Sequence, residues 1–340
     1  MKTKNLNAAE LDAILKRTEN AKVCAVGDIC LDLYLYADMK QSVLSRETPH
    51  YPLPIVKEVS SPGGGGNVLA NMAALGAQVL PVSVIGNDWR GWLLTNALTE
   101  KGVNTARLVR ADGFITPAYV KPMRMGISDV VYEDPRLDFE NRSPMDTETE
   151  KMLLAAFEEA AENADAVAVA DQMDQGIITD AVREKLFEIA RKKPVIVDSR
   201  SKLPLYFGHN IILKPNEVEA ARALGVEAPA DMDGFEALVR RLAEKNGAPV
   251  LMTIGDKGAL WCDGNGPMLA PAVPAKSPID IVGCGDTFLS AFTCALAVGA
   301  EPAMAAAFGC IASAVTVKKI GMTGTASPAE IIAKFKEYEK

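Results

Sequence analysis

Val23-Cys-Ala-Val-Gly-Asp-Ile29 is the stretch that decides the fold class of this 340-residue chain. The run is continuously apolar up to its glycine and lacks the alternation of a half-exposed strand, so it predicts a strand buried on both faces. Similar runs recur along the chain, and helix-period segments separate most of them. This pattern indicates an α/β fold, a doubly wound and mostly parallel sheet with helices on both faces. The further predicted strands are 79–85, 166–170, 195–197, 211–213 and 250–254.

Apolar residues with a period of 3.6 predict the helices of this fold. Gly76, Gly102 and Gly299 each follow the last turn of a predicted helix, as C-terminal caps do. The helix at 286–298 is apolar nearly all round, which predicts deep burial. The full set of predicted helices is 7–19, 67–75, 88–100, 177–192, 217–224, 233–245, 286–298, 302–318 and 328 to the C-terminus.

Residues 33–60 and 113–142 break this rhythm. Both segments carry short alternating patterns, several prolines and no long helical period, and each is inserted between core elements. We expect them to build one small β-layer over an end of the sheet. No long polar linker and no internal repeat divides the chain, so residues 1–340 are expected to form one domain.

Composition excludes several classes of function. The net charge of −8 argues against a broad nucleic-acid surface, because phosphate neutralisation needs clustered cations. No run of about 18 apolar residues predicts a membrane span, and the N-terminus lacks the apolar core of a signal peptide. We therefore expect a cytoplasmic protein with no nucleic-acid or membrane partner.

Cysteine and histidine usage does not favour a zinc site or a Ser-His-Asp triad. The six cysteines include no Cys-x-x-Cys pair, and the two histidines, His50 and His209, lie far apart in sequence. Most of the cysteines lie within apolar runs. They are expected to be buried, reduced thiols.

Gly283-Cys-Gly-Asp286 is the sharpest chemical feature, placed between an extended segment and the apolar helix. Two glycines permit a tight turn whose N–H groups point at one spot, and the helix start adds partial positive charge there. Phosphoryl transfer to a hydroxyl needs such donors for the transferred group, together with a base for the alcohol proton. Taken alone, the pattern is equally consistent with Asp286 as a helix cap.

A second glycine motif, Gly63–Gly66, precedes Asn67 at a predicted helix start. A loop without side chains allows close backbone approach to a small polar ligand such as a sugar, while a flexible loop before an ordinary helix is the alternative. The chain has no P-loop motif. The turn Gly27–Cys30 is not the glycine-rich turn that a Rossmann oxidoreductase needs after its first strand.

With both motifs in place, the chain resembles the ribokinase/PfkB family of carbohydrate kinases over nearly its full length. Gly64-Gly-Gly-Asn67 with Ala73-Ala-Leu-Gly76 resembles the first signature of that family, and Asp280–Asp286 resembles the second. Lys214-Pro-Asn-Glu-Val-Glu219 is similar to its phosphate and magnesium element, and Thr253–Gly258 to the turn that meets the nucleotide. The resemblance implies a ribokinase-like fold and ATP-dependent phosphorylation of a sugar or sugar phosphate.

The resemblance also implies roles for individual residues. Asp286 would be the catalytic base, and the backbone of Gly283, Cys284 and Gly285 would form the anion hole. The implied sugar-binding residues are Asp28, Asp32, Gly64, Gly65 and Asn67. The implied nucleotide-binding residues are Lys214, Asn216, Glu219, Thr253, Gly255 and Gly258.

Cations and partners follow from the same resemblance. Glu219 would hold the Mg²⁺ of Mg-ATP through water, and Asp280 lies where some members place a monovalent cation such as K⁺. Segments 33–60 and 113–142 fall where the family carries a β-lid, which closes over substrate and often mediates homodimer formation.

Within the family, the chain is most similar to the D-glycero-D-manno-heptose 7-phosphate kinase subgroup. Gly27–Tyr34 resembles its opening, and the stretches Pro52–Lys57 and Arg136–Glu140 resemble its lid strands. Arg46 and Arg136 are candidates for holding a substrate phosphate, because Arg offers a bidentate fork. Ordinary solvated arginines on a lid are the alternative.

Departures from that subgroup leave a different sugar open as the acceptor. His50 falls near an acidic position of the subgroup, and residues 171–176 lack its lysine. Cys310 stands where many members of the family have Asn, and Cys284 replaces the usual Ala. A catalytically silent relative that senses a sugar or nucleotide is the alternative in function, although such a protein has no chemical need for Asp286.

Overall fold

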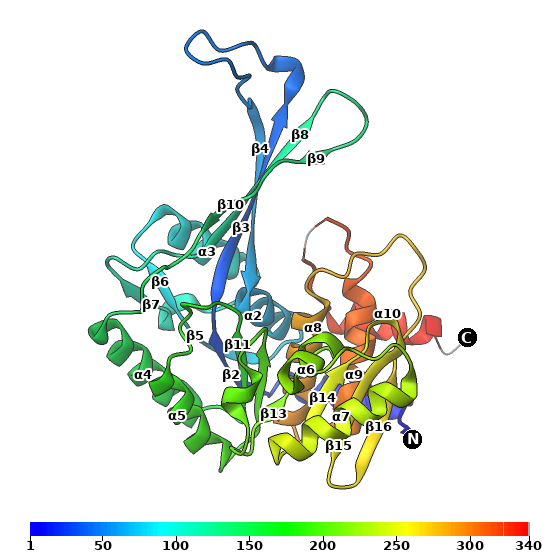
Figure 1. Cartoon of the computed structure of the whole chain (residues 1–340). Coiled ribbons are helices and arrows are strands. Elements are labelled where there is room, and N and C mark those ends of the chain that lie inside the picture. The colour runs from blue at the N-terminus through cyan, green and yellow to red at the C-terminus, as the bar shows by residue number, and fades with distance from the viewer. Residues whose placement is uncertain (322, 339–340) are drawn as a thin grey trace.

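The computed structural model describes residues 1–321 and 323–338. Its main sheet consists of β1 (Lys2–Thr3), β2 (Lys22–Gly27), β5 (Gln78–Val82), β11 (Ala166–Asp171), β12 (Val195–Ser199), β13 (Ile212–Leu213), β14 (Val250–Thr253), β15 (Gly258–Asp263) and β16 (Gly266–Pro271). The strand order is β1-β16-β15-β14-β13-β12-β11-β2-β5 (Figure 1). The strands from β5 to β14 run parallel, whereas β15 is antiparallel to both of its neighbours.

Helices cover both faces of the main sheet and enclose two apolar cores (Figure 1). The first core includes residues of α1 (Ala8–Thr18), α2 (Gly65–Ala74), α3 (Trp89–Glu100), α8 (Cys284–Ala297), α9 (Pro302–Thr316) and α10 (Pro328–Tyr338). The second includes α4 (Thr147–Glu162), α5 (Asp180–Ala190), α6 (Glu217–Leu224) and α7 (Met232–Asn246). In β2, Val23 and Ala25 face the first core, and Cys24 and Val26 face the second. Burial on both faces explains the unbroken apolar pattern of this strand.

A second sheet of five strands projects from the main body, as Figure 1 shows. It consists of β3 (Ile29–Asp38), β4 (Ile55–Gly64), β8 (Ala118–Met125), β9 (Tyr132–Glu133) and β10 (Leu137–Phe139), and we call it the projecting sheet. Segments 33–60 and 113–142 both supply strands to it. Two further strands, β6 (Val84–Gly86) and β7 (Val109–Ala111), pair only with each other among the described residues.

Two of the predicted strands are divided in the structure. The run 23–29 ends as a main-sheet strand at Gly27, and Ile29 already begins β3 of the projecting sheet. The run 79–85 is divided at Ser83, whose hydroxyl donates to the carbonyl of Gly27 at 2.8 Å. Burial continues across both breaks, so an apolar pattern does not reveal that the chain changes sheets.

The helix predictions hold with small shifts at the ends, and one helix was missed. The predicted 177–192 helix begins at Asp180, because Thr179 caps it by accepting from the N–H of Val182. Helix α4 has no predicted counterpart, although Asp146 caps its start by accepting from the N–H groups of Glu148 and Thr149. The antiparallel strands β15 and β16 were also not predicted.

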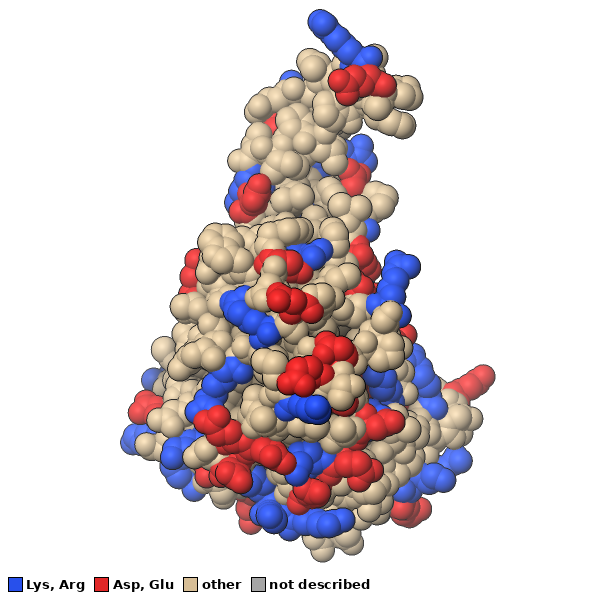
Figure 2. Space-filling view, turned by 90° about the vertical axis from the view of Figure 1, so that its left-hand side faces the viewer, with Lys and Arg blue, Asp and Glu red and all other residues tan. Residues whose placement is uncertain are grey.

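The predicted glycine caps are confirmed: Gly76, Gly102 and Gly299 have φ values of 88°, 82° and 76°. All six cysteines are free thiols, five of them buried. No described helix combines the length and apolarity required to cross a bilayer. Figure 2 shows charges of both signs interspersed over one face of the body, and a projecting sheet that is mostly uncharged.

Candidate active site

The turn before α8 has the geometry of an anion site. Gly283 is the N-cap, with φ of 77°, and a Cβ added there would overlap Thr323. Glycine is therefore needed both for the backbone conformation and for space. The first N–H groups of a helix lack intrahelical acceptors and can bind a ligand. In α8 the N–H of Cys284 donates to the carbonyl of Ile281 at 3.2 Å, and the N–H groups of Gly285 and Asp286 follow it in the first turn. Burial raises the pKa of the neighbouring Cys284 thiol to about 11, so this side chain stays neutral.

Asp286 lies in the first turn of α8, beside this anion turn. Loss of solvent around its carboxyl group raises the pKa to about 7, and the negative charge of Asp198 adds to the effect. A hydrogen bond from Asn67 and the positive charge of Lys214 act in the opposite direction. A carboxyl group poised near neutral pH is suited to accept a proton from an alcohol.

Asn67 reaches Asp286 from α2. Its buried amide Nδ2 donates to Asp286 Oδ2 at 3.1 Å. The helix starts at the second glycine motif, where Gly64 has φ of 54° and the N–H of Gly65 donates to the carbonyl of Asp28 at 2.7 Å. A Cβ on Gly65 would lie 2.9 Å from that carbonyl oxygen, so close approach explains the glycine.

Lys214 lies next to the turn Gly283–Gly285, which we call the anion turn. Its Nζ is 2.7 Å from Asp198 Oδ2, and both residues are buried. Burial alone would lower the pKa of Lys214, but the charge and hydrogen bond of Asp198 raise it above the ordinary value. Nζ lies 3.8 Å from the position that a Cβ on Gly285 would take. A permanent positive charge therefore stands next to the turn.

The predicted nucleotide-side residues follow β13 and β14. Asn216 and Glu219 form the capping box of α6. The N–H of Asn216 donates to the Glu219 carboxylate at 2.9 Å, and the N–H of Glu219 donates to the Asn216 side-chain oxygen at 2.8 Å. Burial raises the pKa of Glu219, although the N–H of Asn216 opposes the shift. Thr253 pairs with Asn216, and Gly255 and Gly258 flank the turn that follows. In doubly wound folds, ligands bind at the carboxyl ends of the strands.

Asp32 points from β3 toward Lys121 of β8, with 3.0 Å between Oδ1 and Nζ. The same ammonium donates to the Tyr34 hydroxyl at 3.1 Å. Burial raises the pKa of Asp32, and Lys121 opposes this. Lys121 was not predicted, since a single lysine on an alternating strand looks like an ordinary solvated residue in the sequence.

The structure separates the two arginines predicted to hold a phosphate. Arg136 makes a bidentate pair with Asp138 at 2.6 and 2.7 Å, and its charge is close enough to lower the pKa of Asp32. Arg46 is exposed in the loop between β3 and β4. That loop begins beyond Asp38, six residues along the strand from Asp32, which corresponds to about 20 Å.

Asp28 uses both carboxylate oxygens to hold a loop. They accept from the backbone N–H groups of Gln172, Met173 and Ile177 at 2.9, 2.8 and 2.7 Å. Burial raises its pKa to about 6, although these three donors oppose the shift. The contacts give Asp28 a structural task, and its contact with substrate stays a prediction.

Asp280 is also engaged with backbone donors. Its oxygens accept from the N–H groups of Val282 and Gly321 at 3.0 and 2.9 Å. Within residues 1–321 and 323–338, no group of three or more His, Cys, Asp or Glu side chains is arranged to hold a metal ion. The monovalent-cation site at Asp280 stays a prediction.

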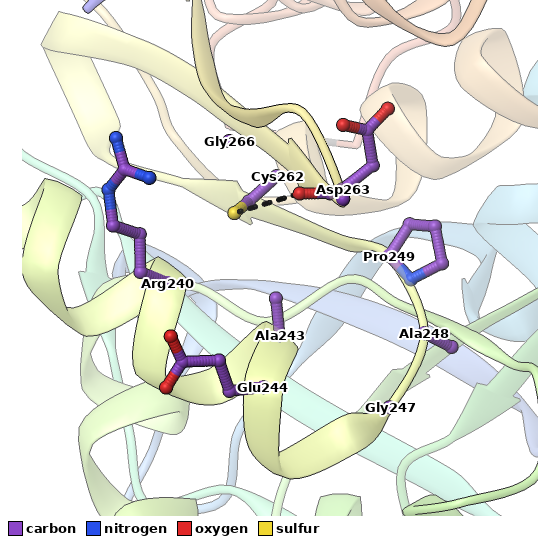
Figure 3. Close-up of a pocket in the computed structure, with 10 residues that line it drawn as sticks. Arg240, Ala243, Glu244, Gly247, Ala248, Pro249, Cys262, Asp263 and Gly266 are labelled. Carbon is purple, nitrogen blue, oxygen red and sulfur yellow. Dashed lines mark hydrogen bonds between the residues drawn. The ribbon is translucent and has the colours of Figure 1, made fainter.

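A cavity of about 420 Å³ lies elsewhere, between α7 and the β14–β16 edge (Figure 3). Its wall includes Arg240 and Glu244 of α7, Pro249 before β14, and Cys262 and Asp263 of β15. Pro249 precedes β14, whereas Thr253 ends that strand. The cavity is therefore at the opposite end of the strand from the Asp286 site.

Comparison with known proteins identifies the family of the chain. The model of the pfkB family carbohydrate kinases matches residues 20–330. The chain is 31% identical over 326 residues to the bifunctional protein HldE of Trichlorobacter lovleyi, covering 95% of this chain and 64% of that protein. It is 32% identical over 317 residues to the protein of the same name from Caulobacter vibrioides, covering 92% and 62%. The chain thus spans under two thirds of the length of these two relatives.

Solved structures share the fold. Arabidopsis thaliana ribokinase, complexed with ribose and ATP, has a TM-score of 0.69 at 20% identity, with 93% of this chain and 99% of that chain covered. Phosphofructokinase-2 from Escherichia coli, in complex with fructose-6-phosphate, has a TM-score of 0.70 at 18% identity, with 94% and 100% covered. The fold is ribokinase-like, and by the family match the chain is a phosphotransferase that belongs to the pfkB family of carbohydrate kinases.

Proposed function

We propose that this protein transfers the γ-phosphate of ATP to a hydroxyl group of a sugar or sugar phosphate, with Asp286 as the general base. The observation that carries the proposal is the placement of Asp286. Its carboxyl group, with a pKa of about 7, lies in the first turn of a helix whose N–H groups and Lys214 form an anion site. A base and an anion site side by side are the parts that this chemistry requires.

Each residue around the anion turn has a separate role in the proposed reaction. Asp286 takes the proton of the attacking hydroxyl, while Asn67 orients the carboxylate through its 3.1 Å hydrogen bond. The N–H groups at Gly283–Gly285 stabilise charge on the transferred phosphoryl group. Lys214 adds a positive charge to that spot, held in place by Asp198. Removing one such donor commonly costs 10²–10³-fold in kcat, so each should be measurable.

Mg-ATP would bind on the side of α6 and the turn after β14. Mg²⁺ prefers oxygen ligands and retains several waters, and the carboxylate of Glu219 fits that preference. One of its oxygens caps α6, which leaves the other for a magnesium-bound water. When bound, Mg²⁺ neutralises phosphate charge. Asn216 positions Glu219, and Thr253, Gly255 and Gly258 would line the nucleotide.

The acceptor would lie under the projecting sheet, which acts as a lid. Asp32 is placed to accept hydrogen bonds from sugar hydroxyls. Lys121 and Arg136 lie near Asp32, and their positive charges would stabilise a phosphate group on the sugar. Heptose 7-phosphate is the acceptor that we favour, since the HldE proteins are relatives at 31–32% identity. A different sugar is the second candidate, because Lys121 and Arg136 are already paired with carboxylates.

The tip of the projecting sheet favours a homodimer. Large apolar side chains are exposed there, including Val43 at 72% and Ile127 at 68%. Contiguous exposed apolar surface commonly marks an interface between proteins. In a twofold dimer the tip of the projecting sheet of each subunit would cover the tip of the other, because a twofold interface buries the same patch on both subunits. The apolar residues exposed at the tip are Val43, Leu44, Tyr51, Leu53, Ile55, Val56, Ile127, Val130, Val131 and Tyr132.

A coupled assay of ADP release with Mg-ATP tests the proposal against a panel of sugars and sugar phosphates. We expect turnover that requires both an acceptor and Asp286, and that is greater with a phosphorylated acceptor. If no acceptor supports turnover while ATP or a sugar still raises the melting temperature, the protein is a sensor of the same fold rather than a kinase.

A further inference from the structure

Asn71 lies one helical turn after Asn67 on α2 and is 1% exposed. Its side chain contacts its own helix and two segments that are distant in sequence. Nδ2 donates to the carbonyl of Asn67 at 2.9 Å and faces the carbonyl of Gly324 at 3.4 Å. Oδ1 lies 3.1 Å from the hydroxyl of Thr287, the residue after Asp286. The amide therefore touches α2, α8 and the segment that leads into α10.

The chemistry of the partners fixes the orientation of this amide. Carbonyl oxygens only accept, so the nitrogen must face Asn67 and Gly324. The oxygen then faces Thr287, whose hydroxyl oxygen is 3.1 Å from Asn71 Oδ1 and 3.2 Å from the carbonyl oxygen of Gly283, so the two acceptors share one hydroxyl donor. Asn71 is thus linked to the N-cap of the anion turn through one hydroxyl group.

The third partner segment also borders the anion turn. Thr323, next to Gly324, packs against Gly283, leaving no space for a Cβ on that glycine. Asn71 consequently contacts one residue beside the base, one residue beside the wall of the anion turn, and the backbone of the residue that hydrogen-bonds the base. No aliphatic side chain of similar size could satisfy these groups, and leaving them buried without partners is costly.

We propose that Asn71 is a positioning residue for phosphoryl transfer: it fixes α2, α8 and the 323–324 segment together, so that Asn67, Asp286 and the Gly283 turn keep one geometry. The inference rests on the proposed function, in which Asp286 is the base. It goes beyond that function by assigning a task to a residue that contacts neither the acceptor nor the nucleotide site. A displacement of about 1 Å can cost about 10²-fold in rate, so this task has a kinetic signature.

The test compares Asn71→Leu, which keeps the volume, with Ser290→Ala as a matched control. Ser290 lies one turn after Asp286 on α8, and its hydroxyl oxygen is 3.0 Å from the carbonyl of Val68 on α2 and 2.7 Å from the backbone carbonyl of Asp286. Both variants lose a buried polar group at the α2–α8 contact, but Ser290→Ala leaves the hydrogen bonds of the Asp286 and Thr287 side chains in place. We expect kcat/KM to fall roughly 10- to 100-fold in Asn71→Leu and to stay within about twofold of the parent in Ser290→Ala.

A second readout does not depend on turnover. Carbon-13 NMR of aspartate-labelled protein, with Asp286→Asn to assign the signal, follows the ionisation of Asp286. The hydrogen bond from Asn67 stabilises the ionised form of Asp286. A displacement of Asn67 in Asn71→Leu should therefore move the titration midpoint of Asp286 to higher pH, whereas Ser290→Ala should leave it unchanged. An unchanged midpoint and rate in Asn71→Leu, or equal changes in both variants, overturns the inference. If Asn71→Leu does not fold, Thr287→Val takes its place with the same expected shift. Loss of the Asp286 requirement in the parent would instead contradict the proposed function.

Discussion

Asn67 of α2 donates a hydrogen bond to Asp286 of α8 at 3.1 Å, across 219 positions of sequence. The residue after the Gly63–Gly66 motif is therefore in direct contact with the residue after the Gly283–Gly285 turn. Asn67 follows the glycines that pack against Asp28, whereas Asp286 follows the glycines of the anion turn. In the proposed function, the acceptor side and the phosphate side of the site would therefore meet at the carboxyl group of Asp286.

The pH dependence of the reaction follows from the state of Asp286. Its pKa in the folded protein is about 7, raised from 3.8, so the carboxyl group carries a proton below neutral pH. Only the ionised form accepts a proton. We expect kcat/KM to rise with pH and to level off above about 7, measured at constant ionic strength with saturating Mg-ATP. A flat profile between pH 5.5 and 8 contradicts the assignment.

The same shift has a consequence for stability with a definite sign. A carboxyl group with a raised folded-state pKa favours folding while it is protonated, and the contribution is lost as pH rises from 3.8 through 7. Asp286→Asn should therefore have a higher melting temperature than the parent at pH 8, and a smaller difference at pH 5. Differential scanning calorimetry at both pH values measures this.

Asp28 and Asp32 should respond differently to the same substitution. Asp28→Asn replaces one of the two acceptor oxygens by an NH2 group and leaves at least one of the three backbone donors without its acceptor. It should destabilise the protein by about 1–3 kcal/mol, with little effect on the KM of the acceptor. Asp32→Asn should raise that KM about tenfold, since a hydrogen bond to a charged group is lost. Urea unfolding and steady-state kinetics separate the two outcomes. A large KM effect in Asp28→Asn would restore Asp28 as a substrate contact.

Local features of this fold could be predicted from the sequence because each depends on a few neighbouring residues. Gly76, Gly102 and Gly299 cap helices through their own backbone conformation. The apolar runs of the parallel strands reflect burial on two faces. The break after Gly27 was not predictable, because Asp28 is held there by Ala170 and the loop of Gln172, far along the chain.

Paired charges of the site were the part that sequence patterns did not reveal. Asp198 follows an apolar strand and Lys121 lies on an alternating one, and neither stands in a motif. Their tasks depend on Lys214 and Asp32, which only the fold brings near them. Asn71 lies between the two halves of the first signature, and two of its three partners, Thr287 and Gly324, belong to distant segments. One signal was available for α4: Asp146 followed by a helix-period apolar pattern marks a helix start.

The buried pair of Asp198 and Lys214 should be costly to break from one side. Asp198→Asn leaves the Lys214 ammonium without its counter-charge, and we expect a loss of about 3–5 kcal/mol in denaturant unfolding. The double variant Asp198→Leu/Lys214→Met should recover much of that stability, because no buried charge remains. Its turnover should stay low, since the anion turn has lost its cation. Full activity in the double variant would remove Lys214 from the mechanism.

The apolar tip of the projecting sheet should determine the oligomeric state. Leu44→Glu and Ile127→Glu place charges within this surface and should convert a dimer to a monomer in sedimentation velocity. Met152→Glu is the matched control, because Met152 is an exposed apolar residue on α4, outside the projecting sheet. A parent protein that sediments as a monomer at all concentrations contradicts the dimer.

The most direct test of the account is the turnover of Asp286→Asn, measured as ADP release with Mg-ATP and the best acceptor from the panel. The amide keeps the size of the side chain but cannot take a proton. We predict that kcat falls about 10²- to 10⁴-fold while the calorimetric affinity for Mg-ATP is retained. A variant that binds Mg-ATP and turns over within threefold of the parent would show that Asp286 is not the base.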